Sequence, residues 1–120
     1  MNDGRRGLHV RTKDFALQVV RLYSSLPKSE EARVLGKQLL RSGTSVGAHY
    51  REATRARSRA EFISKLQAGM QELEETAYWL ELLIEGGIVS SAQLAGVRTE
   101  ANDLMAMLVS SVKTAKRSKS

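Results

Sequence analysis

An apolar seam runs without a break along residues 62–83 of the sequence. Its members recur at alternating intervals of four and three residues, the spacing that places side chains on one face of an α-helix. The seam consists of Phe62, Leu66, Gly69, Leu73, Thr76, Leu80 and Leu83. Ser58, with Glu61 three residues later, has the pattern of a capping box, and the Gly86-Gly87 pair follows the seam as glycine often follows a helix. The sequence therefore predicts one long helix from Ser58 to this glycine pair.

Three further segments carry the signals of helices. In residues 12–25 the apolar side chains are spaced 4-3-4, and Pro27 closes this helix and opens the next, because proline is tolerated in a first turn. Ser90 and Gln93 repeat the capping pattern and start the last helix. The seam of that helix is Leu94, Val97, Ala101, Leu104, Leu108 and Ser111. No alternation of period two and no Asn-Gly or Asp-Gly turn indicates a strand.

Length and connection lengths together predict the fold. A chain of 120 residues forms one domain, and short connections make successive helices antiparallel neighbours. We therefore expect an all-α, antiparallel up-down-up-down four-helix bundle over residues 12–116. Residues 1–11 are predicted to be a flexible N-terminus, and residues 117–120 a frayed basic C-terminus.

Residues 30–57 are rich in Gly, Ser and Thr, yet they sort by type when placed on a helical wheel. An apolar arc holds Leu35, Leu39, Val46, Tyr50 and Ala53. Beside it lies an arc of small residues, Gly36, Gly43 and Gly47. On the other side lies a basic arc of Arg33, Lys37, Arg41, Arg51 and Arg55. A loop would have no reason to sort in this way, so the segment is predicted to be a continuous helix, joined to the next near Arg57-Ser58.

The glycines of this helix call for an explanation, because each costs roughly 1 kcal/mol against alanine in a helix interior. We expect close helix packing at Gly36, Gly43 and Gly47, where the missing side chains let a neighbouring helix approach. The alternative is that one or more of these glycines breaks the helix.

A surplus of positive charge indicates anionic partners, nucleic acid above all. The formal net charge is +6, a surplus that residues 62–90 do not share. The residues expected to contact RNA or DNA phosphates are Arg33, Lys37, Arg41, Arg51, Arg55, Arg57, Arg59, Lys113, Lys116 and Arg117. Alternatively, the basic arc is a solvated helix face, or its arginines pair with acids of a neighbouring subunit such as Glu72 or Glu75. In that last case the protein is an interaction scaffold without a direct nucleic-acid role.

A second apolar surface is predicted on the side of the third helix away from its seam. Tyr78, Trp79 and Leu82 lie together there. Because aromatic residues are enriched at protein interfaces, we expect these three side chains to form a subunit contact. The alternative is that the fourth helix or a terminus of the same chain covers them.

The residues for catalysis or metal binding are missing from the sequence. There is no cysteine, and His9 and His49 belong to different segments, so the His and Cys ligand sets of zinc and di-iron bundles are not formed. No Walker-type phosphate loop occurs. We expect no enzyme activity, no cofactor and no metal. No signal-peptide core or membrane span is recognised either, which predicts a cytoplasmic protein.

Three stretches of sequence resemble a known family. They are QLLRSGTSVGAHYREA (residues 38–53), EFISKL (residues 61–66) and ETAYWLELL (residues 75–83). The chain resembles the bacterial four-helix-bundle family that includes proteins encoded in intervening sequences of large-subunit ribosomal RNA genes and the accessory variability determinant of diversity-generating retroelements. The resemblance implies a cytosolic bundle that assembles into a homopentameric ring. It also implies nucleic acid as a partner and, for the retroelement branch, a reverse transcriptase.

Overall fold

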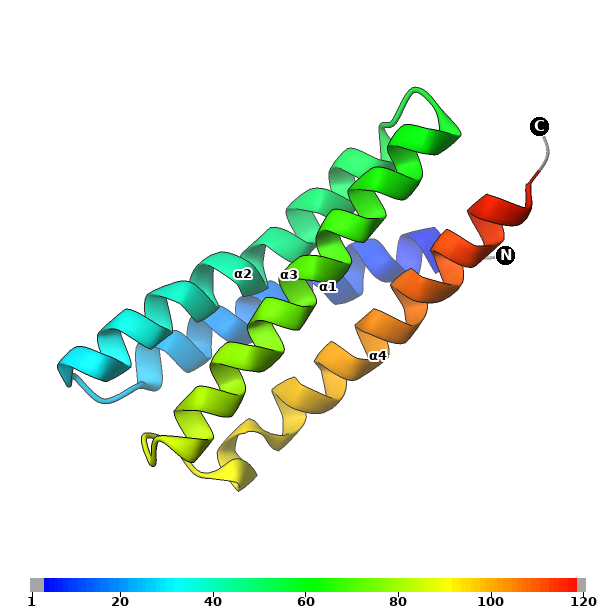
Figure 1. Cartoon of the computed structure of the whole chain (residues 1–120). Coiled ribbons are helices and arrows are strands. Elements are labelled where there is room, and N and C mark those ends of the chain that lie inside the picture. The colour runs from blue at the N-terminus through cyan, green and yellow to red at the C-terminus, as the bar shows by residue number, and fades with distance from the viewer. Residues whose placement is uncertain (1–3, 119–120) are drawn as a thin grey trace.

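The computed structural model describes residues 4–118 and consists of four antiparallel helices (Figure 1). They are α1 (Gly4–Ser25), α2 (Glu30–Thr54), α3 (Arg59–Glu85) and α4 (Ser91–Arg117). The predicted all-α four-helix fold is confirmed. Within the described residues no helix is both long enough and apolar enough to cross a membrane.

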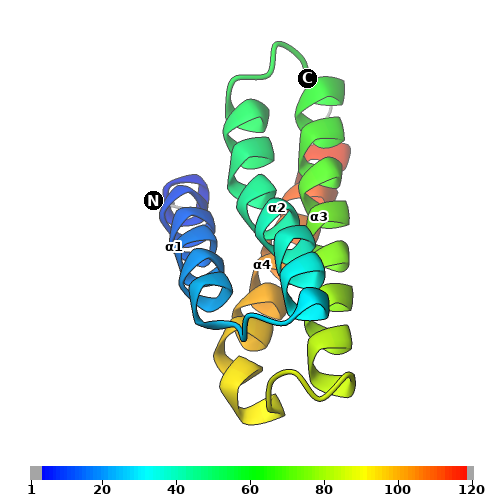
Figure 2. The same ribbon diagram turned by 90° about the vertical axis from the view of Figure 1, so that its left-hand side faces the viewer.

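The helices form a rod in which each one packs against its neighbours in the chain. The rod measures 52 × 23 × 20 Å, and α1 also contacts α4, though less extensively than the consecutive helices contact each other. The connection between α2 and α3 lies at the same end of the rod as the start of α1 and the end of α4 (Figures 1 and 2). The other two connections lie at the opposite end.

Helix α1 begins earlier than predicted. It is helical from Gly4, so the flexible N-terminus predicted for residues 1–11 is wrong from residue 4 onward, while residues 1–3 lie outside the described part. Leu8 is 2% exposed and extends the buried seam through Thr12 to Phe15. The seam was missed because Thr12 is polar; its Oγ1 donates a 2.7 Å hydrogen bond to the carbonyl oxygen of Leu8 and can therefore be buried.

The bounds of α2 also differ from the prediction. The helix begins at Glu30 instead of Pro27, because the Ser29 side chain caps it by accepting a hydrogen bond from the Ala32 amide. It continues without a break through Gly43 and Gly47, as predicted. It ends at Thr54, so residues 55–58 form the connection to α3. At the other end of the chain, α4 remains helical to Arg117, and residues 119–120 of the predicted frayed end lie outside the described part.

The capping signals are confirmed at α4 and in part at α3. Ser90 and Gln93 form a complete capping box. Ser58 caps α3 by accepting a hydrogen bond from the Glu61 amide, but the Glu61 carboxylate accepts from the Arg57 amide instead of the Ser58 amide. Both helices thus begin directly after the serine that the sequence predicts as the cap, Ser58 for α3 and Ser90 for α4.

The buried core follows the predicted apolar positions with few exceptions, one of which is Leu35 of α2, only partly buried against the core. In α3 every seam residue is buried except Phe62, which packs against the core while remaining partly exposed. In α4 the last buried position is Val112 instead of the predicted Ser111. The buried face of α2 is Ala32, Gly36, Leu39, Ser42, Gly43, Val46, Tyr50 and Ala53.

The three glycines of α2 face α1 at short range. A Cβ atom on Gly43 would lie 2.8 Å from Cγ2 of Val19, closer than carbon atoms can approach without a shift. At Gly36 the nearest atom would be Cδ1 of Leu26 at 2.8 Å. At Gly47 it would be Oγ1 of Thr12 at 3.2 Å. Helix α2 therefore has no side chains along the line where α1 crosses it. This is the close helix packing that the sequence predicts at the three glycines.

Replacing Gly43 by alanine is expected to destabilise the protein despite the better helix propensity of alanine. Val19 is fully buried and has no room to move, so overpacking costs about 1–3 kcal/mol against a propensity gain of about 1 kcal/mol. Gly96→Ala is the matched control, because its Cβ would meet only Gln18 at 3.6 Å on an exposed part of α4. Urea denaturation followed by circular dichroism should show a lower free energy of unfolding for Gly43→Ala and an equal or higher one for Gly96→Ala. Equal gains in both variants would contradict the close contact.

Candidate nucleic-acid interface

The exposed surface of α2 divides into two flanks with different surroundings. Arg41 projects toward α3, where it meets the carboxylates of Glu72 and Glu75. Arg51 lies on the opposite flank, where it lines a shallow groove between α2 and α1 together with Lys13. The predicted basic arc is therefore not one uniform surface.

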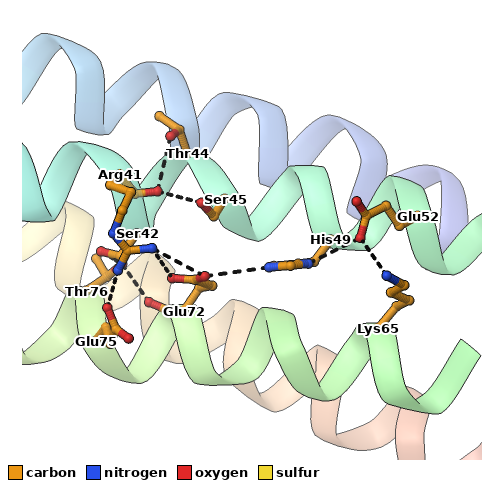
Figure 3. A network of polar contacts seen from close by, with 10 residues as sticks. All are labelled: Arg41, Ser42, Thr44, Ser45, His49, Glu52, Lys65, Glu72, Glu75 and Thr76. Atoms are coloured by element: carbon orange, nitrogen blue, oxygen red, sulfur yellow. Dashed lines mark hydrogen bonds and ion pairs between the residues drawn. The ribbon is translucent and has the colours of Figure 1, made fainter. Parts of the chain in front are cut away.

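A polar network ties the first flank of α2 to α3 (Figure 3). Arg41 lies 3.3 Å from Glu72 and also pairs with Glu75. Nε2 of His49 lies 3.5 Å from the same Glu72 carboxylate. Glu52 then accepts from Lys65 of α3 at 3.2 Å. The side chain of Glu72 is only 16% exposed. Its ion pairs with these donors are therefore less screened by water than those of an exposed carboxylate.

A buried hydrogen bond lies beneath this network. The hydroxyl groups of Ser42 and Thr76, both fully buried, are 2.8 Å apart. Thr76 Oγ1 is also 2.8 Å from the carbonyl oxygen of Glu72, so both hydroxyl groups have partners. Because a slipped register would leave them unpaired in an apolar environment, this pair fixes how α2 and α3 face each other.

Two of the arginines predicted to contact phosphates are engaged within the chain. Arg41 neutralises Glu72 and Glu75, and Arg33 lies 2.6 Å from Glu30. The same two acids of α3 had been considered as partners across a subunit boundary, but Arg41 reaches them within one chain. Arg33 and Arg41 are therefore poor candidates for phosphate binding.

The remaining predicted cations gather mainly at one end of the rod. Four lie on the last turn of α2, on the connection that follows and on the first residue of α3, and three lie on the last turns of α4. This basic end, as we call it, consists of Arg51, Arg55, Arg57, Arg59, Lys113, Lys116 and Arg117. All seven are exposed, and the connection between α2 and α3 lies at the same end of the rod as the end of α4 (Figures 1 and 2). None of the seven forms an ion pair with an acid in the described part of the chain. Lys37, the remaining predicted cation, lies apart from them in the first half of α2.

Acidic side chains predominate toward the opposite end. Glu74, Glu81 and Glu85 are exposed on the second half of α3, and Glu30 and Glu31 open α2 there. The charge of the protein is therefore polarised along its long axis. Two elements of this site were missed from the sequence: Lys13, because the exposed face of α1 carried no recognised pattern, and Lys65, because its partner Glu52 lies on another helix.

The predicted subunit contact residues do not share one environment. Tyr78 is 53% exposed, with its ring 5.1 Å from that of Trp79. Trp79 packs partly against the core of its own chain, and its Nε1 is buried without a hydrogen-bond partner among the described residues. Leu82 is half-buried. Trp79 lies two turns after Glu72, which faces α2, so the indole belongs to the α2 flank of α3 more than to its outer face.

A separate ion pair connects α1 and α4, the neighbouring helices with the least extensive contact. Arg11 of α1 donates to both carboxylate oxygens of Glu100 in α4, at 2.8 and 3.0 Å. This hydrogen bonding raises the pKa of Arg11, and Asp103 lies 3.6 Å away. No three His, Asp or Glu side chains of the described residues converge in a way that could hold a metal ion.

Comparisons with known proteins identify the family of the chain. The family described as 23S rRNA-intervening sequence protein matches residues 9–110. The chain belongs to this family. No curated protein matches it. A crystal structure described as a protein of unknown function from the S23 ribosomal protein family of Bacteroides thetaiotaomicron VPI-5482 is 38% identical, with a TM-score of 0.87. The match covers 92% of this chain and 99% of the other, so the resemblance stated from sequence is confirmed and extends over the whole bundle.

The contribution of the Lys65–Glu52 pair to stability is expected to depend on pH. Lys65, and to a smaller extent His49, lowers the pKa of Glu52. A carboxylate whose pKa is lowered in the folded state stabilises the fold above its unfolded pKa of about 4.3, and this stabilisation is lost as the pH falls. Lys65→Met should therefore be less stable than wild type near pH 7, and the gap should close as the pH approaches about 3.

Thermal unfolding across this pH range measures the gap. Lys37→Met is the matched control, because Lys37 has no acid partner among the described residues, and its difference from wild type should change little with pH. A gap for Lys65→Met that stays constant down to the acid limit would show that the pair contributes through packing instead of charge.

Proposed function

We propose that the protein is a non-enzymatic, homo-oligomeric, cytoplasmic protein that binds the phosphate backbone of nucleic acid through its basic end. The observation that carries this proposal is the set of seven cations at one end of the rod without acid partners in the described chain. Elsewhere Arg11, Arg41 and Lys65 pair with acids. The cations there that have no acid partner among the described residues, such as Lys37 and Arg98, are dispersed instead of clustered. Like charges repel, so a surface of this kind is stabilised by an anion that lies against it.

The chemistry of the basic end fits phosphate groups better than base edges. Its cations project from helix ends and a short connection, and no recognition helix is presented for insertion into a groove. Contacts of this kind position a protein on nucleic acid without reading its sequence. The acidic half of α3 repels phosphates, so nucleic acid is expected to contact the end of the rod. The sequence alone predicts contact along the basic face of α2 instead.

The family supports a nucleic-acid context in general terms. Its description refers to sequences that intervene in 23S rRNA, and the similar crystal structure is attributed to the S23 ribosomal protein family. RNA is accordingly the first ligand to test, and DNA the second. A reverse transcriptase or another protein is a further partner that the resemblance implies.

Self-association would strengthen this function. Tyr78 and Leu82 offer apolar surface on the outer side of α3, and the resemblance implies a ring of five subunits. Five copies of a basic end would increase both the local field and the avidity for a long polyanion. Trp79 contributes to this contact mainly by holding the ring of Tyr78 in place.

The alternative function is a protein-interaction scaffold without a nucleic-acid role. In this alternative, the arginines of the basic arc form ion pairs with acids of a neighbouring subunit. For Arg41 those acids, Glu72 and Glu75, are already occupied within one chain. The seven cations of the basic end are the residues that distinguish the two functions.

Removing two charges from the basic end should weaken nucleic-acid binding and its dependence on salt. In a titration of labelled RNA or DNA between about 50 and 200 mM salt, each lost phosphate contact reduces the slope of log K against log salt by about 0.7–0.9. Arg57→Gln combined with Arg59→Gln should therefore reduce the slope by about 1.4–1.8. Fluorescence anisotropy measures both affinity and slope.

Arg41→Gln is the matched control, with the same change of charge at a residue that is paired within the chain. It should lower the free energy of unfolding and leave the slope unchanged. If Arg41→Gln reduces the slope and the double variant does not, the basic arc of α2 is the binding surface and the basic end is not.

A charge introduced at Tyr78 should reduce the size of the oligomer. Tyr78→Arg places a cation on the proposed contact, where desolvating it is costly, while leaving the core untouched because the ring is exposed. Light scattering coupled to size-exclusion chromatography measures the molar mass, and circular dichroism checks that the helices are retained. Exposed Val34 on α2 provides the control as Val34→Arg, which should not change the mass. An unchanged mass for Tyr78→Arg would place the subunit contact elsewhere.

A further inference from the structure

The aromatic residues nearest the basic end offer little open ring surface. The chain has six Phe, Tyr and Trp residues, and of these only Tyr50 and Phe62 lie near the basic end. Tyr50 is 3% exposed and its ring meets that of His9 edge-on at 5.0 Å. Phe62 packs against the core cluster and is only partly exposed. Tyr78, the one large aromatic side chain that is exposed, lies on the second half of α3, among the acids.

Binding of a single strand normally depends on such ring faces. Proteins that hold single-stranded RNA or DNA stack its bases on aromatic side chains, each worth about 1–3 kcal/mol, in addition to charge. Where little ring surface is available, the electrostatic contribution dominates. That contribution favours a duplex, which carries one charge per about 1.7 Å of axis, against about 3.4 Å for one of its strands.

The dimensions of the basic end also suit a duplex. The rod is 23 × 20 Å in cross-section, wider than the roughly 12 Å major groove of B-form DNA. Its cations come from two separate places on this cross-section, the connection between α2 and α3 and the last turns of α4. Two groups of cations on one blunt surface are suited to phosphates of both strands at once.

We propose that the ligand of the basic end is double-stranded nucleic acid, held by phosphates of both strands and without base stacking. This inference rests on the proposed function and names the class of ligand that the same site binds. The shared chemistry is the paired phosphate backbone, and separate duplexes of RNA and of DNA distinguish its two sources.

The test compares duplexes with their own strands. Labelled duplexes of RNA and of DNA, each about two helical turns long, and the four single strands are titrated with the full-length protein at several salt concentrations. At least one duplex should bind at least about tenfold more tightly than either of its strands. The salt slope per phosphate contact should be about 0.9 for the duplex and about 0.7 for a single strand. A preference for only one duplex would support the inference and identify its source.

Single strands that bind as tightly as the duplexes would overturn this inference and leave the proposed function standing. No salt-dependent binding to any of the six probes would refute the proposed function itself. The two failures are therefore distinguishable in one experiment.

Two variants test for stacking directly. Arg57→Lys combined with Arg59→Lys keeps the charges but removes the planar guanidinium groups, so affinity for the duplex should change less than about threefold if the phosphates act as point charges. Phe62→Leu keeps an apolar side chain against the core and should leave affinity for every probe unchanged. A selective loss of single-strand affinity in either variant would show that bases stack on the removed group and would contradict the inference.

Discussion

The close approach of α1 to α2 is the contact on which the rest of the structure depends. Gly36, Gly43 and Gly47 leave α2 without side chains along that line, and Val19 of α1 fills the space at its centre. Bringing the backbones together places the opposite side of α2 against α3, where Ser42 meets Thr76 in the core. The costs of three glycines in one helix are thus offset by packing on one side and by a fixed register on the other.

This arrangement also decides which charges are free. The flank of α2 that meets α3 brings Arg41 to Glu72 and Glu75, so a helix face that looks uniformly basic in the sequence is partly neutral in the structure. At the connection after α2, the carboxylate of Glu61 accepts from the backbone amide of Arg57. The side chains of Arg55, Arg57 and Arg59 form no ion pair among the described residues. The polarised charge therefore reflects both the order of charged residues along the chain and the way the helices pack.

Most of the fold could be predicted from periodicity and capping. Thr76 was correctly placed in the seam of α3, because spacing outweighs polarity when the hydroxyl group can find a partner. The same reasoning would have included Thr12 and extended α1, but a seam near a chain end offers fewer repeats to recognise. The candidate site was predicted less well. Which lysine or arginine is neutralised depends on acids that are distant in sequence, as Glu72 is from Arg41 and Glu100 is from Arg11.

The location of the chain ends has a practical consequence for studies of this protein. The start of α1 and the end of α4 lie at the same end of the rod as the connection between α2 and α3 (Figures 1 and 2). A purification tag or fluorescent protein fused to either terminus would therefore add bulk at the same end of the rod as the basic end. The Gly86-Gly87 turn, at the far end of the rod, offers a place for an inserted label that leaves this surface accessible.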